Sequence, residues 1–336
     1  MILAGDIGGT KTILALFTCD GGEIVPVDEQ IFPSRSYPGF LQVVDEFLKV
    51  GVQHVEPLQK AFDGACFGVA GPVVNGRSET TNLPWIVDAD QIGRQFKISS
   101  VALLNDVEAT AYGALGLTEK GYGSLNPGQA HAAGNRAVIA AGTGLGEAIL
   151  FWDGSTHRPS ASEGGHSDFA PRNPLEIKLL EYLLKRYTRV SYERVLSGPG
   201  LWNIYQFLKE AGHGEEPSWL SERLSKEDPP SVISEAALAG KAELCVKALD
   251  LFASVYGAEA GNLALKTLAI GGIYVGGGIA PKILSKLIDG TFMKTFLDKG
   301  RFASLMSRIP VRVILDEKTA LLGAARYACL QGGKTS

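Results

Sequence analysis

Two short glycine-rich turns in this sequence carry the residue types that bind phosphate. The first is Asp6-Ile7-Gly8-Gly9-Thr10 and the second is Gly142-Thr143-Gly144, and each lies between two apolar runs. Glycine lets the backbone approach an anion and direct several N–H groups toward it, and the threonine hydroxyl adds a donor. Asp6 would repel phosphate, but its carboxylate could hold a hydrated Mg²⁺ ion. A simple hairpin turn would explain either segment if it stood alone.

A third glycine cluster, Gly276-Gly277-Gly278, follows an apolar run and precedes a helical pattern. Glycine there would allow a flat nucleoside to lie against the backbone, and an ordinary strand-to-helix turn explains the pattern equally well. The run from Gly142 to Glu147 is not a dinucleotide fingerprint, because Glu147 stands where the last glycine is required and a strand pattern follows. The sequence contains no G-x-x-x-x-G-K-[ST] segment, which excludes a P-loop.

Further along, polar side chains gather in patterns that could bind a sugar and accept its proton. Asn105 and Asp106 end an apolar run and begin a helical pattern, where either residue is a good helix N-cap. A carboxylate at this point could also accept the proton of an attacking hydroxyl in phosphoryl transfer. Residues 162–168 form a glycine-rich loop that contains Glu163 and His166, whose side chains can hydrogen-bond sugar hydroxyls.

A zinc site is disfavoured in this loop. His166 is the single histidine of the loop, and no cysteine lies near it. Glu193 precedes a Ser-Gly-Pro turn and, taken alone, indicates a solvent-exposed helical residue.

The cysteines are far apart and form no C-x-x-C pair, which predicts reduced thiols in a reducing compartment. They are Cys19, Cys66, Cys245 and Cys329.

Strands that alternate with helices are expected to position these candidates. The segments 3–17 and 138–151 each read as strand, turn, strand, which suggests an internal duplication with one such unit in each of two domains. The alternation predicts an α/β fold. Further strands are expected at 65–70, 101–104 and 268–275. Helices are expected at 39–50, 107–115, 174–186, 200–211, 231–264 (as two helices) and 320–330. Residues 212–230 are polar and contain three prolines, which predicts a loop.

Length and charge narrow the class of protein. A chain of 336 residues suggests two domains. The formal net charge of −4 gives no electrostatic reason to expect nucleic acid or an anionic membrane as a partner. The N-terminus begins directly with a strand pattern instead of a signal peptide, and no apolar run is long enough for a membrane helix. We therefore expect a cytoplasmic protein.

Together, the three glycine turns resemble the phosphate-1, phosphate-2 and adenosine elements of the actin, hexokinase and Hsp70 superfamily. Over almost its whole length the chain resembles the bacterial glucokinase family of the Escherichia coli type. The motifs that carry this resemblance are GDIGGT at 5–10, GVAGPV at 68–73, TNLPW at 81–85, LLND at 103–106, AGTGLGEA at 141–148, SEGGHSDFAP at 162–171, ERVLSGPGL at 193–201, GNLAL at 261–265, GGGIAP at 276–281 and DKGRF at 298–302.

The resemblance implies an actin/hexokinase-like (ribonuclease H-like) α/β fold of two domains, with ATP and Mg²⁺ between them, and a homodimer. We expect a small domain of residues 1–112 and 318–336 and a large domain of residues 113–317. The implied reaction is ATP-dependent phosphorylation of D-glucose to glucose 6-phosphate, which feeds glycolysis. The matching glucose-binding residues are Asn105, Asp106, Glu163, His166 and Glu193, with Asp106 as the catalytic base. The expected cofactor-binding residues are Asp6 (for Mg²⁺, through water), Gly8, Gly9, Thr10, Gly142, Thr143, Gly144, Gly276, Gly277 and Gly278.

Two departures and three alternatives accompany this interpretation. Lys11 stands where some family members have Asn, and the chain lacks the C-x-C-G-x-x-G-C-x-E cluster of the related repressor–kinase family, which disfavours zinc. The substrate could instead be another hexose, such as mannose or an N-acetylated amino sugar. A sugar-sensing regulator would need a DNA-binding segment before Asp6. A filament-forming or chaperone ATPase would leave the sugar-binding residues without a purpose.

Overall fold

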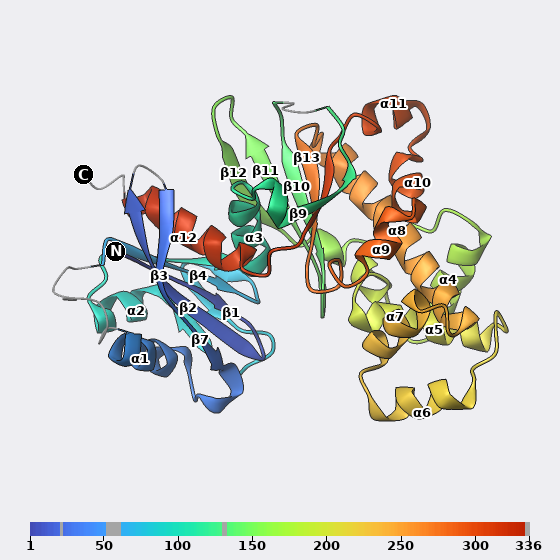
Figure 1. Ribbon diagram of the computed structural model, residues 1–336, viewed down its shortest axis with the longest axis horizontal. Coiled ribbons are helices and arrows are strands. Elements are labelled where there is room, and N and C mark those ends of the chain that lie inside the picture. Colours follow the sequence, from blue (N-terminus) through green and yellow to red (C-terminus); the bar gives the residue numbers. More distant parts are fainter. Residues whose placement is uncertain (21–22, 52–61, 130–132, 333–336) are drawn as a thin grey trace. The chain divides into compact units, whose positions relative to one another are not determined.

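The computed structural model describes residues 1–20, 23–51, 62–129 and 133–332 (Figure 1). Its contacts divide the chain into two compact units. The N-terminal unit comprises Met1–Thr118 and Asp316–Ser336, and the central unit comprises Glu119–Leu315. The domain boundaries expected from the sequence, after residue 112 and before residue 318, stay a prediction, because compactness alone does not show independent folding.

The N-terminal unit is built on a sheet with the strand order β3-β2-β1-β4-β8. The strands are β1 (Ile2–Ile7), β2 (Lys11–Asp20), β3 (Glu23–Pro33), β4 (Gly64–Val69) and β8 (Val101–Asn105). Strands β1 and β2 form the expected antiparallel hairpin, whereas β1, β4 and β8 are parallel. The carboxyl ends of these three parallel strands therefore meet at one edge of the sheet, where Asp6 and Asp106 lie.

Helices cover both faces of this sheet because its strands are apolar on alternating sides. Ile13 and Phe17 of β2 pack in one cluster with α12, while Leu14 and Leu16 pack in another cluster with α1. The helices of this unit are α1 (Phe40–Gly51), α2 (Ala89–Phe96), α3 (Asp106–Ala114) and α12 (Thr319–Gly332). A small second sheet contains β5 (Val73–Val74), β6 (Arg77–Glu79) and β7 (Ile86–Asp88).

Helices α3 and α12 touch backbone to backbone at two glycines. A Cβ atom added to Gly323 would lie 1.8 Å from the carbonyl oxygen of Ala109, and one added to Gly113 would lie 1.9 Å from that of Thr319. The Arg326 guanidinium of α12 also donates to the carbonyl oxygen of Gly113 at 2.8 Å. The C-terminal helix thus holds the helix that begins at Asp106.

Cys19 and Cys329 are joined by a disulfide, so the prediction of four reduced thiols was wrong for this pair. The two residues are separated by 310 positions, but their Cα atoms lie 6.0 Å apart because α12 packs against the sheet beside β2. Sequence spacing alone could not reveal this proximity. Cys66 and Cys245 are buried free thiols, as expected.

The substitution Cys329→Ser is expected to lower the free energy of unfolding by about 2 kcal/mol, because the disulfide restricts the unfolded chain. Urea unfolding of the oxidised wild type and of the variant would measure this difference. A thiol reductant should lower the stability of the wild type to that of Cys329→Ser and leave the variant unchanged. Equal stability of the oxidised wild type and the variant would contradict the prediction.

The sheet of the central unit repeats the arrangement of the first sheet. Its strand order is β12-β11-β10-β13-β14-β9, with β10 antiparallel to β11 and parallel to β13. The strands are β9 (Tyr122–Asn126), β10 (Arg136–Ala141), β11 (Leu145–Trp152), β12 (His157–Ser162), β13 (Gly272–Gly276) and β14 (Val311–Ile314). The predicted recurrence of the strand–turn–strand unit is confirmed.

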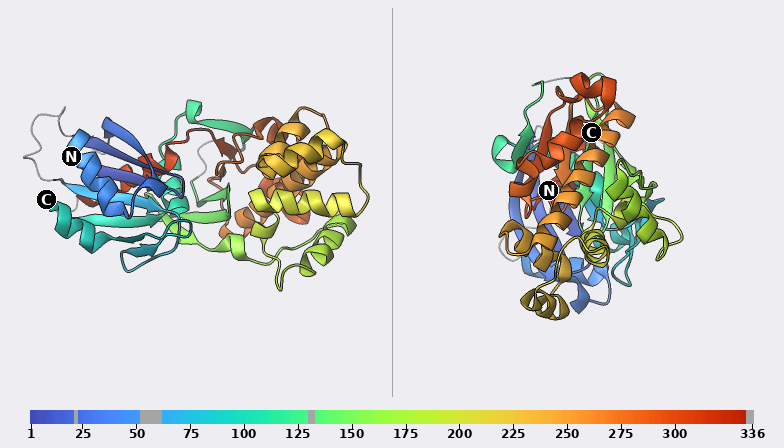
Figure 2. Two further views of the ribbon diagram at one scale, coloured as in Figure 1. Left: turned by 90° about the horizontal axis from the view of Figure 1, so that it is seen from below. Right: turned by 90° about the vertical axis from the view of Figure 1, so that its right-hand side faces the viewer.

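The helices of the central unit enclose a large apolar core. The long helix α8 packs against β10 and β13, and other helices pack around α8 (Figure 2). They are α4 (Pro174–Leu184), α5 (Gly198–Glu210), α6 (Ser218–Lys226), α7 (Pro229–Leu238), α8 (Glu243–Thr267), α9 (Leu284–Ile288), α10 (Thr291–Leu297) and α11 (Ala303–Met306). The loop predicted at 212–230 was wrong in part, because α6 lies within it. Strand β13 begins later than expected, because α8 continues to Thr267 and Leu268 then turns the chain in a left-handed conformation. Within the described ranges, no helix combines the length and apolar character needed to cross a membrane.

Candidate active site

The first glycine turn joins β1 to β2 and is held in place by Ser34. The Gly8 N–H donates to the carbonyl oxygen of Lys11 at 3.0 Å, and the Ser34 hydroxyl donates to the carbonyl oxygen of Gly8 at 2.7 Å. A Cβ atom added to Gly9 would lie 2.8 Å from Cβ of Asn82. The turn therefore requires small residues, and Thr10 at its end is exposed.

Asp6 and Asp106 face the same edge of the N-terminal sheet, separated by strand β4. Asp6 pairs in register with Gly68, which in turn pairs with Leu104, two residues before Asp106. Gly68 has no side chain to stand between the two carboxyl groups. Burial, and to a smaller extent the negative charge of Asp106, raise the pKa of Asp6 to about 6, although Lys11 partly opposes both effects. This edge is thus suited to a cation or to an incoming hydroxyl group.

Asn105 caps helix α3, as its residue type predicted. Its Oδ1 accepts from the Val107 N–H at 3.0 Å, and its amide nitrogen donates to the carbonyl oxygen of Gly71 at 3.2 Å. Asp106 is the first residue of the helix, and its Oδ1 also accepts from Val107 N–H at 2.9 Å. Negative charge in the first turn of a helix is favoured by the helix dipole. The cap fixes the backbone from which the Asp106 side chain extends.

The second and third glycine turns meet at the end of strand β10. The Ile279 N–H donates to the carbonyl oxygen of Ala141 at 3.2 Å. Gly277 has a φ of +81°, and a Cβ atom there would lie 2.2 Å from the same oxygen, so glycine is required on both counts. No atom within 4 Å obstructs a Cβ atom at Gly142 or Gly278, so both face open space. The two turns therefore form one continuous surface.

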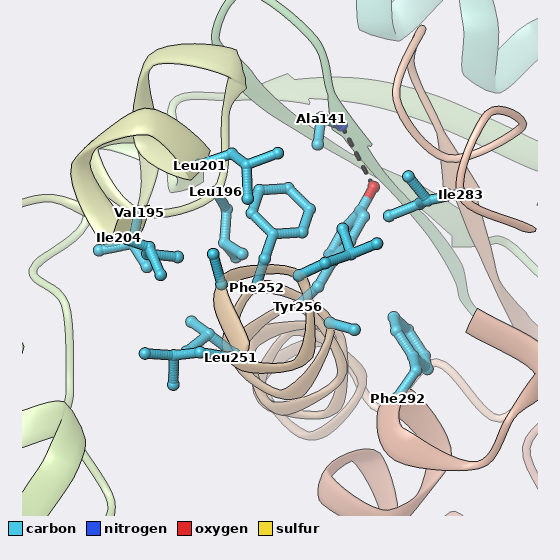
Figure 3. Packing of buried hydrophobic residues seen from close by; sticks show 14 of the residues in the cluster. Ala141, Val195, Leu196, Leu201, Ile204, Leu251, Phe252, Tyr256, Ile283 and Phe292 are labelled. Carbon is cyan, nitrogen blue, oxygen red and sulfur yellow. Dashed lines mark hydrogen bonds between the residues drawn. The ribbon is translucent and has the colours of Figure 1, made fainter. Parts of the chain in front are cut away.

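The Tyr256 hydroxyl fixes the strands that lead into these two turns (Figure 3). It accepts from Ala141 N–H and lies within hydrogen-bonding distance of the carbonyl oxygens of Ile139 and Gly276, each at 3.2 Å. Tyr256 belongs to α8 and its side chain is fully buried. This burial raises the pKa of the hydroxyl well above its ordinary value. One residue thus connects β10 and β13.

Removing this hydroxyl should destabilise the protein. Tyr256→Phe leaves buried backbone groups without their partner, and we expect the free energy of unfolding to fall by about 2 kcal/mol. Tyr182→Phe is the matched control, because the Tyr182 hydroxyl donates to Glu210, whose side chain is 50% exposed, so water can replace it. Denaturant unfolding would compare the two variants. A loss in Tyr256→Phe no larger than in the control would contradict the assignment.

The two turns form part of a pocket of about 550 Å³ within the central unit. Gly142, Thr143 and Gly278 are among its lining residues. Its other walls come from the start of α5, the start of α7 and the segment after β13. These walls contain Gly198, Pro199, Leu201, Trp202, Asp228, Pro229, Pro230, Ser231, Ser234, Ile279, Lys282 and Ile283.

The composition of the pocket suits a flat, partly apolar ligand that carries negative charge. Trp202 and Pro230 supply apolar surface, and the Lys282 side chain provides a cation at the edge. Asp228 caps α7 by accepting from the Ser231 N–H at 3.2 Å. Sequence analysis missed these residues. The Pro-Pro pair after Asp228 is typical of a helix start and could have indicated helix α7. Nothing in the local sequence, however, indicates that this helix start lies near the glycine turns.

The predicted sugar-binding loop forms the short 3-10 helix η4 (Gly164–His166) after β12. A Cβ atom added to Gly165 would lie 2.0 Å from the carbonyl oxygen of Leu145, so the loop packs directly on β11. The Glu163 and His166 side chains are 73% and 53% exposed, with 4.0 Å between carboxylate and imidazole. Arg189 donates to the carbonyl oxygen of His166 at 2.6 Å. Both side chains are therefore available to a ligand on a fixed backbone.

Glu193 lies beside the second glycine turn instead of in a solvent-exposed helix. It belongs to the 3-10 helix η5 (Tyr192–Arg194), and its Oε2 accepts from the Leu145 N–H at 3.1 Å. A Cβ atom added to Gly144 would lie 2.6 Å from this oxygen, which explains the need for glycine. The carboxylate thus connects the turn to the segment that begins α5.

Within each unit the structure brings several predicted residues together. The first turn and the Asn105–Asp106 pair share one sheet edge of the N-terminal unit. In the central unit, Gly142, Thr143 and Gly278 line the pocket, whereas Gly144, Gly276 and Gly277 do not. Across the part of the chain that is described, no group of three or more His, Cys, Asp or Glu side chains could hold a metal ion.

Comparisons with known proteins show to which family this sequence and fold are similar. The sequence model of the family described as Glucokinase matches residues 3–331. The chain is 41% identical to the glucokinase of Nostoc sp., with 98% of each chain covered, and 43% identical to that of Synechocystis sp., with 96% of each covered. Its structure is similar to the crystal structure of glucokinase from an Antarctic psychrotroph, with a TM-score of 0.83 and 32% identity over 97% of this chain and 98% of that one.

Proposed function

The chain belongs to the glucokinase family, and on that premise we propose that it transfers the γ-phosphoryl group of ATP to the 6-hydroxyl of glucose. The observation that carries this proposal is the pocket lined by Gly142, Thr143 and Gly278, three residues for which the family resemblance implies nucleotide binding. A sugar-binding role also gives a function to the exposed side chains of Glu163 and His166.

Asp106 is the general base in this proposal. It accepts the proton of the 6-hydroxyl as that oxygen forms a bond to the γ-phosphorus and the bond from the γ-phosphorus to the leaving oxygen of ADP breaks. Its position at the start of α3, held by the Asn105 cap, supports this role. Asn105, Glu163, His166 and Glu193 bind the remaining hydroxyls of glucose. The exposure of Glu163 and His166 supports their part.

ATP binds with its base and ribose in the pocket, between the Trp202 and Pro230 walls and the Gly278 backbone. Its phosphates contact the turn at Thr143 and the turn of Gly8, Gly9 and Thr10. Carboxylate oxygens are the donors that Mg²⁺ prefers, and the position of Asp6 at the same sheet edge as Asp106 supports a role in holding a cation. Asp6 would hold Mg²⁺ through water. The ion, when bound, neutralises charge on the phosphates.

A coupled assay with ATP, Mg²⁺ and a panel of hexoses tests this function directly. Rapid turnover of glucose, with weak turnover of mannose and of N-acetylated amino sugars, is the expected result. Trp202→Ala should raise the KM for ATP several-fold by removing one apolar wall, with little change in the KM for glucose. Failure to phosphorylate any hexose, by protein that still binds ATP, would overturn the proposal.

Assembly and location are further parts of the proposal. The family resemblance supports a homodimer, and the exposed Ile31 on edge strand β3 is compatible with a contact between copies. Because ATP and glucose are supplied inside the cell, we also infer a cytoplasmic location. Light scattering of the purified protein would test the first point, and cell fractionation would test the second.

A further inference from the structure

Glu147 of β11 is a buried carboxyl group directly behind the sugar-binding turn. It is 3% exposed, and its Oε1 has no hydrogen-bond partner among the described residues. It pairs in register with Ser162, the residue before Glu163. A Cβ atom added to Gly164 would lie 2.0 Å from Glu147 Oε2, so the carboxyl group contacts the turn backbone itself. Nothing in the proposed reaction uses this side chain.

A second buried acid, Glu259 of α8, lies in the same region, and the polar side chains nearby donate hydrogen bonds to it. Glu259 is fully buried and accepts from Asn262 at 2.8 Å and from Lys266 at 3.1 Å. The Tyr192 hydroxyl also bonds to it. Lys266 is thus engaged by Glu259, and Glu147 has no ion pair of its own among the described side chains. A lone buried carboxylate beside another carboxylate is strongly disfavoured.

These surroundings favour the protonated, uncharged form of Glu147. Burial, and to a smaller extent the negative charge of Glu259, raise its pKa to about 7, although Lys266 partly opposes both effects. The hydroxyl groups of Tyr192 on η5 and Tyr256 on α8 also lie in this region, and neither supplies a positive charge. The neighbouring elements carry further titratable side chains, namely Glu193 and Arg194 of η5, His166 of η4, and His157 and Arg158 of β12, but the charges that act on the pKa of Glu147 are those of Glu259 and Lys266. A neutral Glu147 accommodates the turn, whereas an ionised one would draw water into a space that the turn now fills.

We propose that Glu147 is a positioning residue for glucose: it holds the 163–166 turn against β11, and it does so in its uncharged form. This inference rests on the proposed roles of Glu163 and His166 in sugar binding. Gly164 and Gly165 let the turn approach β11 closely, so the carboxyl group of Glu147 sets where both sugar-binding side chains begin. Loss of its proton moves the turn outward and weakens glucose binding without touching the nucleotide pocket.

Steady-state kinetics of Glu147→Gln and Glu147→Ala test the inference. Glu147→Ala should raise the KM for glucose roughly tenfold, because the turn loses its contact and shifts. Glu147→Gln, which keeps the shape and stays uncharged, should restore the KM to within about threefold of wild type at about pH 6. Between about pH 6 and pH 8.5 the glucose KM of the wild type should rise relative to that of Glu147→Gln, with the ATP KM of both unchanged.

The controls separate this inference from the function on which it rests. Glu176→Gln is the matched variant, because Glu176 is also fully buried in the central unit but is paired with Arg172. It should lower stability and leave the pH profile of glucose KM like that of wild type. If Glu163→Gln leaves the glucose KM unchanged, the assignment of the turn fails. If Glu163→Gln raises the glucose KM but the glucose KM of wild type and of Glu147→Gln changes with pH in the same way, only the role of Glu147 fails. This comparison can be made even if Glu147→Ala does not fold.

Discussion

Asp106→Asn should reduce kcat by roughly 10²–10⁴-fold, the usual contribution of a general base. The variant keeps the size of the side chain and an oxygen that can accept from the Val107 N–H, so helix α3 should still begin in the same way. What it loses is the ability to take the proton of the attacking hydroxyl. The KM for glucose should change far less than kcat, because the amide still hydrogen-bonds the sugar.

Glu108→Gln is the control for this variant. Glu108 is a second carboxyl group in the first turn of α3, half-buried, with a pKa raised by burial. Its substitution changes the charge at the helix N-terminus by the same amount, so any loss through the helix dipole should appear in both variants. Turnover of Asp106→Asn within a few-fold of Glu108→Gln would remove Asp106 from the role of base.

The parts of the fold that sequence could predict are those governed by local chemistry. The turn at Gly8 and Gly9 and the turn after Gly276 were found because glycine is required wherever backbone approaches backbone, as at Gly277. Asn105 was recognised as a cap because its side-chain oxygen satisfies a nearby N–H. The edge strands β3 and β12 escaped notice because they are only partly apolar, so their residues follow no clear pattern.

The pocket and the buried carboxyl groups could not be predicted, because they depend on segments far apart in the sequence. Trp202 and Pro230 reach the glycine turns only through the packing of α5 and α7. Glu147 was noted solely for excluding a dinucleotide motif, since its burial against Glu259 follows from the position of α8. The Cys19–Cys329 disulfide has the same origin: 310 positions separate two residues that the sheet and α12 bring together.

The free energy of unfolding should fall with rising pH in the wild type relative to Glu147→Gln. The pKa of Glu147 is about 7 in the folded protein and 4.5 in the unfolded chain, so the folded state binds the proton more tightly. Stability from this group is therefore complete below pH 4.5 and is lost as the pH rises through about 7, a change of about 3 kcal/mol.

Urea unfolding of both proteins across this pH range would measure the effect. Subtracting the two curves removes the contributions of all groups that the proteins share, so the difference isolates the proton of Glu147. A difference that stays constant with pH would show that the carboxyl group ionises as easily in the folded protein as in the unfolded chain. Water or a cation would then have to reach Glu147 behind Gly164, and the turn could not lie directly against it.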